Sequence, residues 1–97
     1  MSVDPNQVTS PLDRWDLHRV IFDGGENSHA IAIGHWDGDR AMVMRWNGGE
    51  EKPKGNPVSR GYPTWFVIPG EFVAAILDVL ALPPDQLQEC REFLQLP

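Results

Sequence analysis

The fold is decided by the stretch HAIAIGHWDGDRAMVMRW, residues 29–46. It contains two apolar runs, residues 29–36 and 40–46, whose Ile, Val and Trp residues favour strands. Between the runs lies Asp37-Gly38, a pair that suits the tight turns whose twist matches that of two antiparallel strands. The stretch therefore predicts a β-hairpin.

Further strand patterns lie on both sides of this hairpin. Residues 17–22 predict a strand before it and residues 64–68 a strand after it, because both are rich in Val, Ile, Phe or Trp. A connection rich in Gly, Pro and charge, residues 47–62, leads to the last strand. A structureless connection of this length is unusual in a compact domain and is either functional or mobile.

Two helical patterns follow the last strand. They cover residues 71–81 and 85–94, and Pro83-Pro84 separates them. Four strands followed by two helices predict an α+β fold, a four-stranded antiparallel meander followed by two C-terminal helices. We expect a single domain over residues 12–97 and a flexible N-terminal tail over residues 1–11, which are mostly polar.

The apolar patterning predicts a homodimer. In the run from His29 to Trp36, Ile31 and Ile33 alternate with Ala30, Ala32 and Gly34, so neither face of the strand is polar. Residues 71–81 are apolar nearly all round, which is typical of a helix buried on most sides. Two helices cannot easily cover both sheet faces and be buried themselves, and a second copy of the chain would supply the missing cover.

Composition indicates an intracellular protein. The one cysteine, Cys90, excludes an intrachain disulfide. Residues 1–11 lack the apolar core of a signal peptide, and no apolar run approaches the length of a membrane span. We therefore expect a cytoplasmic protein that does not enter a membrane.

The charge of the chain is unevenly placed. The net charge of −6 argues against nucleic-acid binding through the whole surface. Residues 40–62, however, hold five basic residues against Glu50 and Glu51, a local balance of 5 − 2 = +3. This segment could bind a small anion or a nucleic-acid backbone, or it could be a solvated loop with ordinary charges.

The sequence contains no signature of an enzyme. His29 and His35 lie six residues apart on one predicted strand, about 20 Å, and cannot share a metal. Cys90 falls on the apolar stripe of the last helix, where a cysteine usually packs as a small hydrophobe. We expect no catalytic residues, no metal site and no cofactor.

The long loop and its flanks supply the candidate binding residues. Arg45 and Arg60 could bind an anionic group, while Trp46, Tyr62 and Trp65 could stack on a ring. Alternatively, the tryptophans are anchors of the core or of a dimer interface, and Arg60 ties the loop to a carboxylate. The first alternative predicts a non-enzymatic protein that binds a partner protein or a small ligand through residues 45–65. Single-stranded nucleic acid is the other ligand that such a surface could bind.

Two resemblances accompany these residues. The pieces RWNG, residues 45–48, and GNPVSRGYPTWF, residues 55–66, resemble small uncharacterised bacterial proteins, some carried on mobile elements such as integron gene cassettes. This resemblance implies a bacterial accessory protein. The order of strands and helix also resembles the bacterial PC4-like single-strand-binding proteins, which are homodimers. This chain departs from them in being acidic, in its extra C-terminal helix and in lacking a lysine-rich first half, so no binding residues are carried over.

Overall fold

The predicted hairpin is present in the computed structural model, which describes residues 2–97. Strands β2 (His29–Trp36) and β3 (Asp39–Trp46) pair in antiparallel register along their whole length. The two residues between them, Asp37 and Gly38, both have positive φ, at 53° and 86°. This is the backbone that a two-residue turn needs to match strand twist, and it explains why Asp-Gly occurs there.

The hairpin is the centre of a four-stranded antiparallel sheet. The strand order is β1-β2-β3-β6, with β1 (Trp15–Asp23) and β6 (Phe66–Val67) at the two edges. The pairing of β1 with β2 shifts register twice, between Leu17 and Arg19 and between Val20 and Phe22. The predicted meander is therefore confirmed, although its first strand is longer and its last strand shorter than the sequence pattern suggested.

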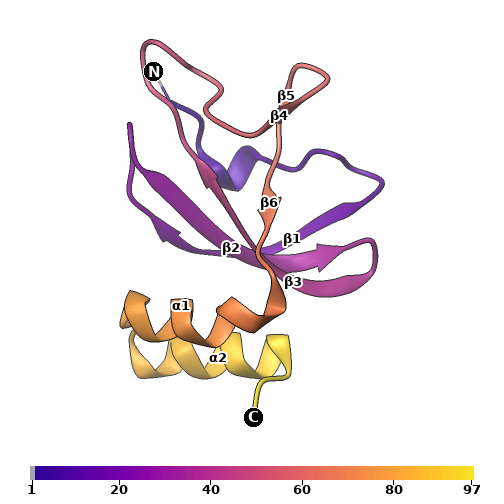
Figure 1. The fold of residues 1–97 in the computed structure, drawn as a ribbon, viewed down its shortest axis with the longest axis vertical. Helices are drawn as coiled ribbons and strands as arrows, with labels where there is room; N and C mark the ends of the chain where they lie inside the picture. Colours follow the sequence, from indigo (N-terminus) through magenta and orange to yellow (C-terminus); the bar gives the residue numbers. More distant parts are fainter. Residues whose placement is uncertain (1) are drawn as a thin grey trace.

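The last strand is short because the backbone before it pairs elsewhere. The N–H of Thr64 donates to the carbonyl oxygen of Pro57 within the long loop, at 3.1 Å. The loop also contains a small hairpin of its own, in which β4 (Val58–Ser59) pairs with β5 (Tyr62–Pro63). The long connection, whose order the sequence left open, thus contains folded structure and lies beyond one end of the sheet (Figure 1).

Both helices lie side by side on one face of the sheet (Figure 1). A 3₁₀ turn, Gly70–Phe72, leads into α1 (Val73–Leu80), and α2 (Pro84–Leu94) follows after a short connection. Each helix ends in a left-handed residue, Ala81 and Gln95 respectively. With the sheet, the two helices form the predicted α+β fold. None of the helices in residues 2–97 is long and apolar enough to cross a membrane.

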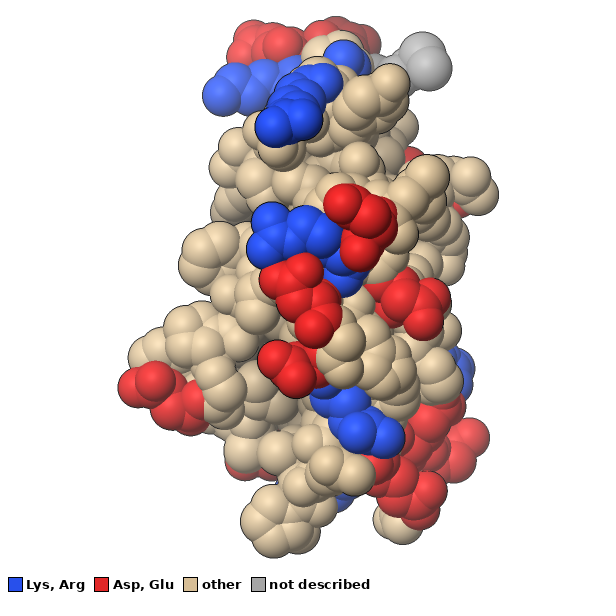
Figure 2. Space-filling model, turned by 90° about the vertical axis from the view of Figure 1, so that its right-hand side faces the viewer, with Lys and Arg blue, Asp and Glu red and all other residues tan. Residues whose placement is uncertain are grey.

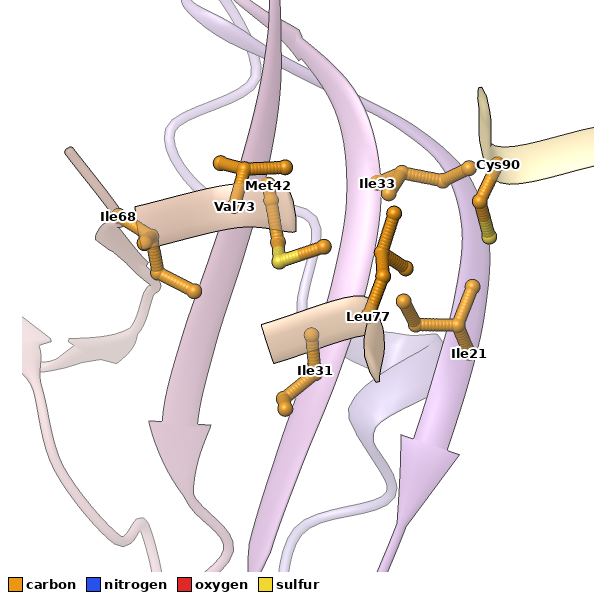
Figure 3. Packing of buried hydrophobic residues seen from close by; sticks show 8 residues of the cluster. All are labelled: Ile21, Ile31, Ile33, Met42, Ile68, Val73, Leu77 and Cys90. Carbon is orange, nitrogen blue, oxygen red and sulfur yellow. The ribbon is translucent and has the colours of Figure 1, made fainter. Parts of the chain in front are cut away.

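The main core lies between the sheet and the helices. Leu77 of α1 points toward Ile21 and Ile33 of the sheet, and Cys90 of α2 lies beside them (Figure 3). These side chains are at most 7% exposed. Ile31 and Ile33 therefore face this core, as the alternation in β2 predicts. The remaining buried members of the cluster are Met42, Ile68 and Val73.

A second core covers the opposite face of the sheet, and the N-terminal segment helps to form it. Val8 is 2% exposed and packs with Trp15, Ala30, Val43 and other apolar residues of this face. The backbone N–H of Val3 donates to the carbonyl oxygen of Asn47. Residue 1 lies outside the described residues.

These contacts differ from the expected flexible tail, since residues 2–11 lie against the domain. They also remove one reason for expecting a homodimer. The second apolar face of the sheet needs no partner chain, because the chain covers it with its own N-terminal segment and two tryptophans, Trp15 and Trp65.

Candidate binding site

The structure separates the five residues predicted to form a binding site into three groups. Arg45 and Trp65 are buried, at 2% and 3% exposure. Arg60 and Tyr62 are exposed on the small β4–β5 hairpin. Trp46 is 57% exposed and lies at the end of β3. The expected single surface with all five side chains is therefore not formed.

Arg45 holds the long loop against the sheet. Its Nη1 donates to the carbonyl oxygens of Thr64 and Pro57, and its Nη2 donates to that of Lys54. Three backbone groups that are distant along the loop thus converge on one guanidinium. Burial lowers the pKa of the Arg45 guanidinium, since desolvation disfavours the charged form. Arg45, which the sequence offered as a residue that could bind an anionic group, is therefore inaccessible to direct ligand contact from solvent.

Gly55 makes room for this arrangement. It has a positive φ of 65°, and a Cβ at this position would lie 2.0 Å from the carbonyl oxygen of Trp46 and 2.7 Å from Nη2 of Arg45. Any side chain would therefore push the loop away from β3. The glycine is required by the close approach as well as by its backbone conformation.

Trp65 belongs to the second core. It packs against Trp15, with 6.2 Å between ring centroids, and its Nε1 donates to the carbonyl oxygen of Val8 at 2.8 Å. The alternative interpretation of the tryptophans as core anchors is thus correct for Trp65. Its ring cannot stack on a ligand in this conformation.

Arg60 and Tyr62 lie on a hairpin that projects from the domain. Arg60 has a positive φ of 52°, and the Lys54 ammonium donates to the carbonyl oxygen of Gly61 at 2.7 Å. Figure 2 shows basic side chains gathered at the upper end of the molecule, with acidic side chains beside them. The local positive charge of the sequence is therefore partly offset on the folded surface.

Trp46 forms one wall of a pocket on the helix-bearing face of the sheet. Met44 and Trp46 point to this face because alternate residues of β3 share a side. The sheet register places Phe66 opposite Met44 and His29 opposite Trp46. The rings of His29 and Trp46 meet edge to face at 5.8 Å. The pocket has a volume of about 220 Å³ and is lined by His29, Met44, Arg45, Trp46, Asn56, Pro57 and Phe66.

An apolar surface continues from this pocket across α1. Phe66 is 58% exposed, Phe72 53% and Val79 84%. A shallow depression of about 530 Å³ lies between them and shares Met44 and Phe66 with the pocket. We call this depression the α1 face; the other residues that line it, all apolar, are Ile68, Pro69, Ala75 and Ile76.

The sequence patterns did not single out Phe66, Phe72 or Val79 as surface residues. The available signal was the nearly complete apolar circumference of the 71–81 pattern, which indicated that part of the helix would need cover. Which part stays exposed depends on where α2 packs. That arrangement is a property of the tertiary structure.

Other side chains that could in principle take part in catalysis or metal binding are engaged in packing. The His18 ring stacks on Phe93 at 4.3 Å between centroids, and its Nε2 lies 3.3 Å from Glu89. Within residues 2–97, no three His, Cys, Asp or Glu side chains are placed to hold a metal ion. Burial and the neighbouring Glu89 raise the pKa of the Cys90 thiol, which disfavours the thiolate.

Comparison with family models, curated proteins and solved structures finds no match for this chain.

Proposed function

We propose that this protein is a non-enzymatic binding protein whose ligand occupies the pocket between Trp46 and Phe66. The ligand is a small molecule or a side chain of a partner protein, and the group that enters the pocket is aromatic or apolar. One observation carries the proposal. Two large aromatic rings, each more than half exposed, flank a concave site although both cores of the fold are already filled.

The chemistry and size of the site support this function. Exposed aromatic rings beside a concavity supply large contact area and favour edge-to-face or offset packing with another ring. The volume of about 220 Å³ is below the 300–1,000 Å³ typical of sites for drug-sized ligands. The pocket therefore suits a single ring. Four of its lining residues, Arg45, Trp46, Asn56 and Pro57, belong to residues 45–65, the region that the sequence marked for binding.

Indole is the probe that tests the proposal. In a titration followed by ¹H–¹⁵N NMR, we expect the indole N–H signal of Trp46 to shift, while that of buried Trp65 stays in place. Trp46→Ala and Phe66→Ala should each weaken binding about tenfold or more, since each removes a wall of the site. Tyr62→Ala is the matched control, because Tyr62 is an equally exposed aromatic residue outside the pocket, at 65%. Unchanged affinity in Phe66→Ala would contradict the proposal.

The α1 face supports a second proposal, self-association into a homodimer. Val79 and Phe72 expose apolar surface with no charged residue between them in the lining of the depression. Apolar patches of several hundred Å² on soluble proteins are commonly interaction sites. The dimer proposal now rests on this face alone, because the sheet is covered on both sides.

Sedimentation equilibrium at micromolar concentration tests the dimer. Val79→Glu should shift the wild-type dimer to monomer, because a carboxylate would be buried in an apolar interface. Leu12→Glu is the control, since Leu12 is also 84% exposed but lies outside the α1 face. A monomeric wild-type protein would remove this proposal and leave the Trp46–Phe66 pocket unaffected.

Single-stranded nucleic acid remains an alternative ligand, for which the site would be the β4–β5 hairpin. Arg60 and Tyr62 lie on this hairpin together, a cation and an exposed ring that could contact a phosphate and a base. Anisotropy of labelled single-stranded DNA at low and then moderate salt tests it. Binding that weakens with salt and is lost in Arg60→Ala and Tyr62→Ala would favour this function.

The setting that we propose is the bacterial cytoplasm, where the protein acts as an accessory protein. The resemblance of the segments at residues 45–48 and 55–66 supports the bacterial origin. A single, buried cysteine is compatible with a reducing compartment. Fractionation of a bacterial host that expresses the untagged protein would test the location.

A further inference from the structure

Arg45 is a buried cation without an anionic partner. Its side chain is 2% exposed, and all of its hydrogen bonds go to backbone carbonyl oxygens. No carboxylate of residues 2–97 forms an ion pair with it. Buried charges in proteins are normally paired, because an isolated charge is costly in a medium of low dielectric constant. The fold therefore retains a positive charge that nothing within the described chain neutralises.

The hydrogen bonding of this guanidinium is also incomplete. An arginine carries five N–H donors, and the Nε of Arg45 is buried without an acceptor. A glutamine could also donate to a loop carbonyl and would bury no charge, whereas a lysine would bury a more strongly hydrated charge than arginine does. The hydrogen bonds to the loop therefore do not by themselves account for a positive charge at this position.

This charge lies next to the proposed pocket. Arg45 is one of the residues that line it, and so is Pro57, whose carbonyl oxygen accepts from Nη1. The pocket thus has two aromatic walls, Trp46 and Phe66, and the guanidinium of Arg45 lies behind it, on the other face of β3, where it donates to the carbonyl oxygen of Pro57. Two further lining residues, His29 and Asn56, carry side-chain N–H groups that can donate to an acceptor.

We propose that the pocket selects small aromatic carboxylates. The ring lies between Trp46 and Phe66, and the carboxylate lies on the side of Arg45, where Asn56 and His29 can donate hydrogen bonds to it. The guanidinium need not touch the ligand. Charges interact strongly through a protein interior, where the effective dielectric constant is far below that of water. This inference rests on the proposed function and specifies the ligand class of the same site.

Three isosteric probes separate charge from shape: benzoate, benzamide and benzamidinium carry −1, 0 and +1 on nearly the same frame. We expect wild-type protein to bind benzoate about tenfold tighter than benzamide, and benzamidinium more weakly than either. The preference should persist at high salt, because a buried charge is screened much less than a surface charge. Calorimetry or NMR titration gives the three dissociation constants.

The outcomes distinguish the ligand class from the function. Equal binding of benzoate and benzamide, with both lost in Phe66→Ala, would overturn the anion preference and keep the aromatic pocket. No binding of any of the three, together with no binding of indole, would overturn both. Preferred binding of benzamidinium would assign the site to cationic ligands, against the inference.

Two variants identify the source of the preference. Arg45→Gln keeps an N–H donor and removes the charge, so a folded variant should bind benzoate and benzamide about equally. Lys52→Gln removes an exposed cation close to Trp46 and should leave the preference unchanged. Loss of the preference in Lys52→Gln would show that a surface charge is responsible and contradict the inference. If Arg45→Gln does not fold, the probe series on the wild-type protein and Lys52→Gln still decides.

Discussion

The indole Nε1 of Trp65 donates a 2.8 Å hydrogen bond to the backbone carbonyl oxygen of Val8. Both residues are at most 3% exposed, and 57 positions separate them in the sequence. This bond joins the N-terminal segment to the end of the long loop, across the second face of the sheet. The second core depends on this connection as well as on apolar packing.

Trp65→Phe should lower the free energy of unfolding by about 2 kcal/mol, because it removes the donor and leaves a buried carbonyl without that partner. Urea denaturation followed by circular dichroism gives the value. Trp46→Phe is the control and should change the free energy by less than about 0.5 kcal/mol, since Trp46 is more than half exposed. Equal effects of the two substitutions would contradict the assignment of Trp65 to the core.

Two positions of α1 offer a matched pair. Leu77 is 1% exposed and Val79 is 84% exposed, although they lie in the same helix. Leu77→Ala should cost about 3 kcal/mol, from lost burial and the cavity that remains. Val79→Ala should be neutral or slightly stabilising in the monomer, because alanine has the higher helix propensity. A large cost at Val79 that grows with protein concentration would indicate that a partner chain covers it.

The Cys90 thiol should react slowly in the folded protein. It is 1% exposed, and burial and Glu89 raise its pKa, so little thiolate is present or accessible at neutral pH. An aromatic disulfide reagent should label it at a rate limited by opening of the helix layer, and rapidly in denaturant. Rapid labelling without denaturant would show that the face of α2 that bears Cys90 is not packed against the sheet.

The ion pair at the hairpin turn should make stability depend on pH. Arg14 forms two hydrogen bonds with Asp37, at 2.8 and 2.7 Å, and holds the pKa of that carboxyl below its ordinary value of 3.8. The unfolded chain therefore binds a proton at a higher pH than the folded chain. The stabilisation is present above the ordinary pKa and is lost as the pH falls through the lowered one.

Asp37→Asn tests this pH dependence, because asparagine also tolerates the left-handed backbone of the turn. We expect the wild-type protein to have the higher melting temperature at neutral pH, with a small difference because the pair is exposed. The difference should disappear once the pH has fallen below the lowered pKa of Asp37. A difference that is constant over this range would assign the effect to the turn backbone instead of the charge.

The hairpin and helices could be predicted because their signals are local. Asp37-Gly38 encodes its own turn, and Pro83-Pro84 ends one helix and begins the next whatever surrounds them. Burial of the N-terminal segment could not be predicted in this way, since Val8 is an isolated apolar residue among polar neighbours. Its burial depends on a concavity formed by residues distant in the sequence, Ala30, Val43 and Trp65 among them.

The candidate site was predictable in position more than in composition. The sequence identified Trp46 as a candidate binding residue and left its exposure open, and it offered Arg45 as an anion-binding residue although the fold buries Arg45. Only the fold of residues 54–64 around its guanidinium encloses it. Phe66 was expected as an ordinary strand residue. Its exposure follows from its position in an edge strand, where it borders the α1 face but is left more than half exposed.

Both margins of the sheet are unsuited to strand addition. The register shifts in β1 bend that margin, and β6 offers only two paired residues before Pro69 interrupts the backbone donors. An edge that is bulged or very short gives a foreign strand no continuous ladder to extend. The chain can thus display exposed aromatic side chains without inviting fibril growth through its backbone. Side chains at the pocket and on α1 are then what select a ligand or partner. A single substitution there can change this selectivity.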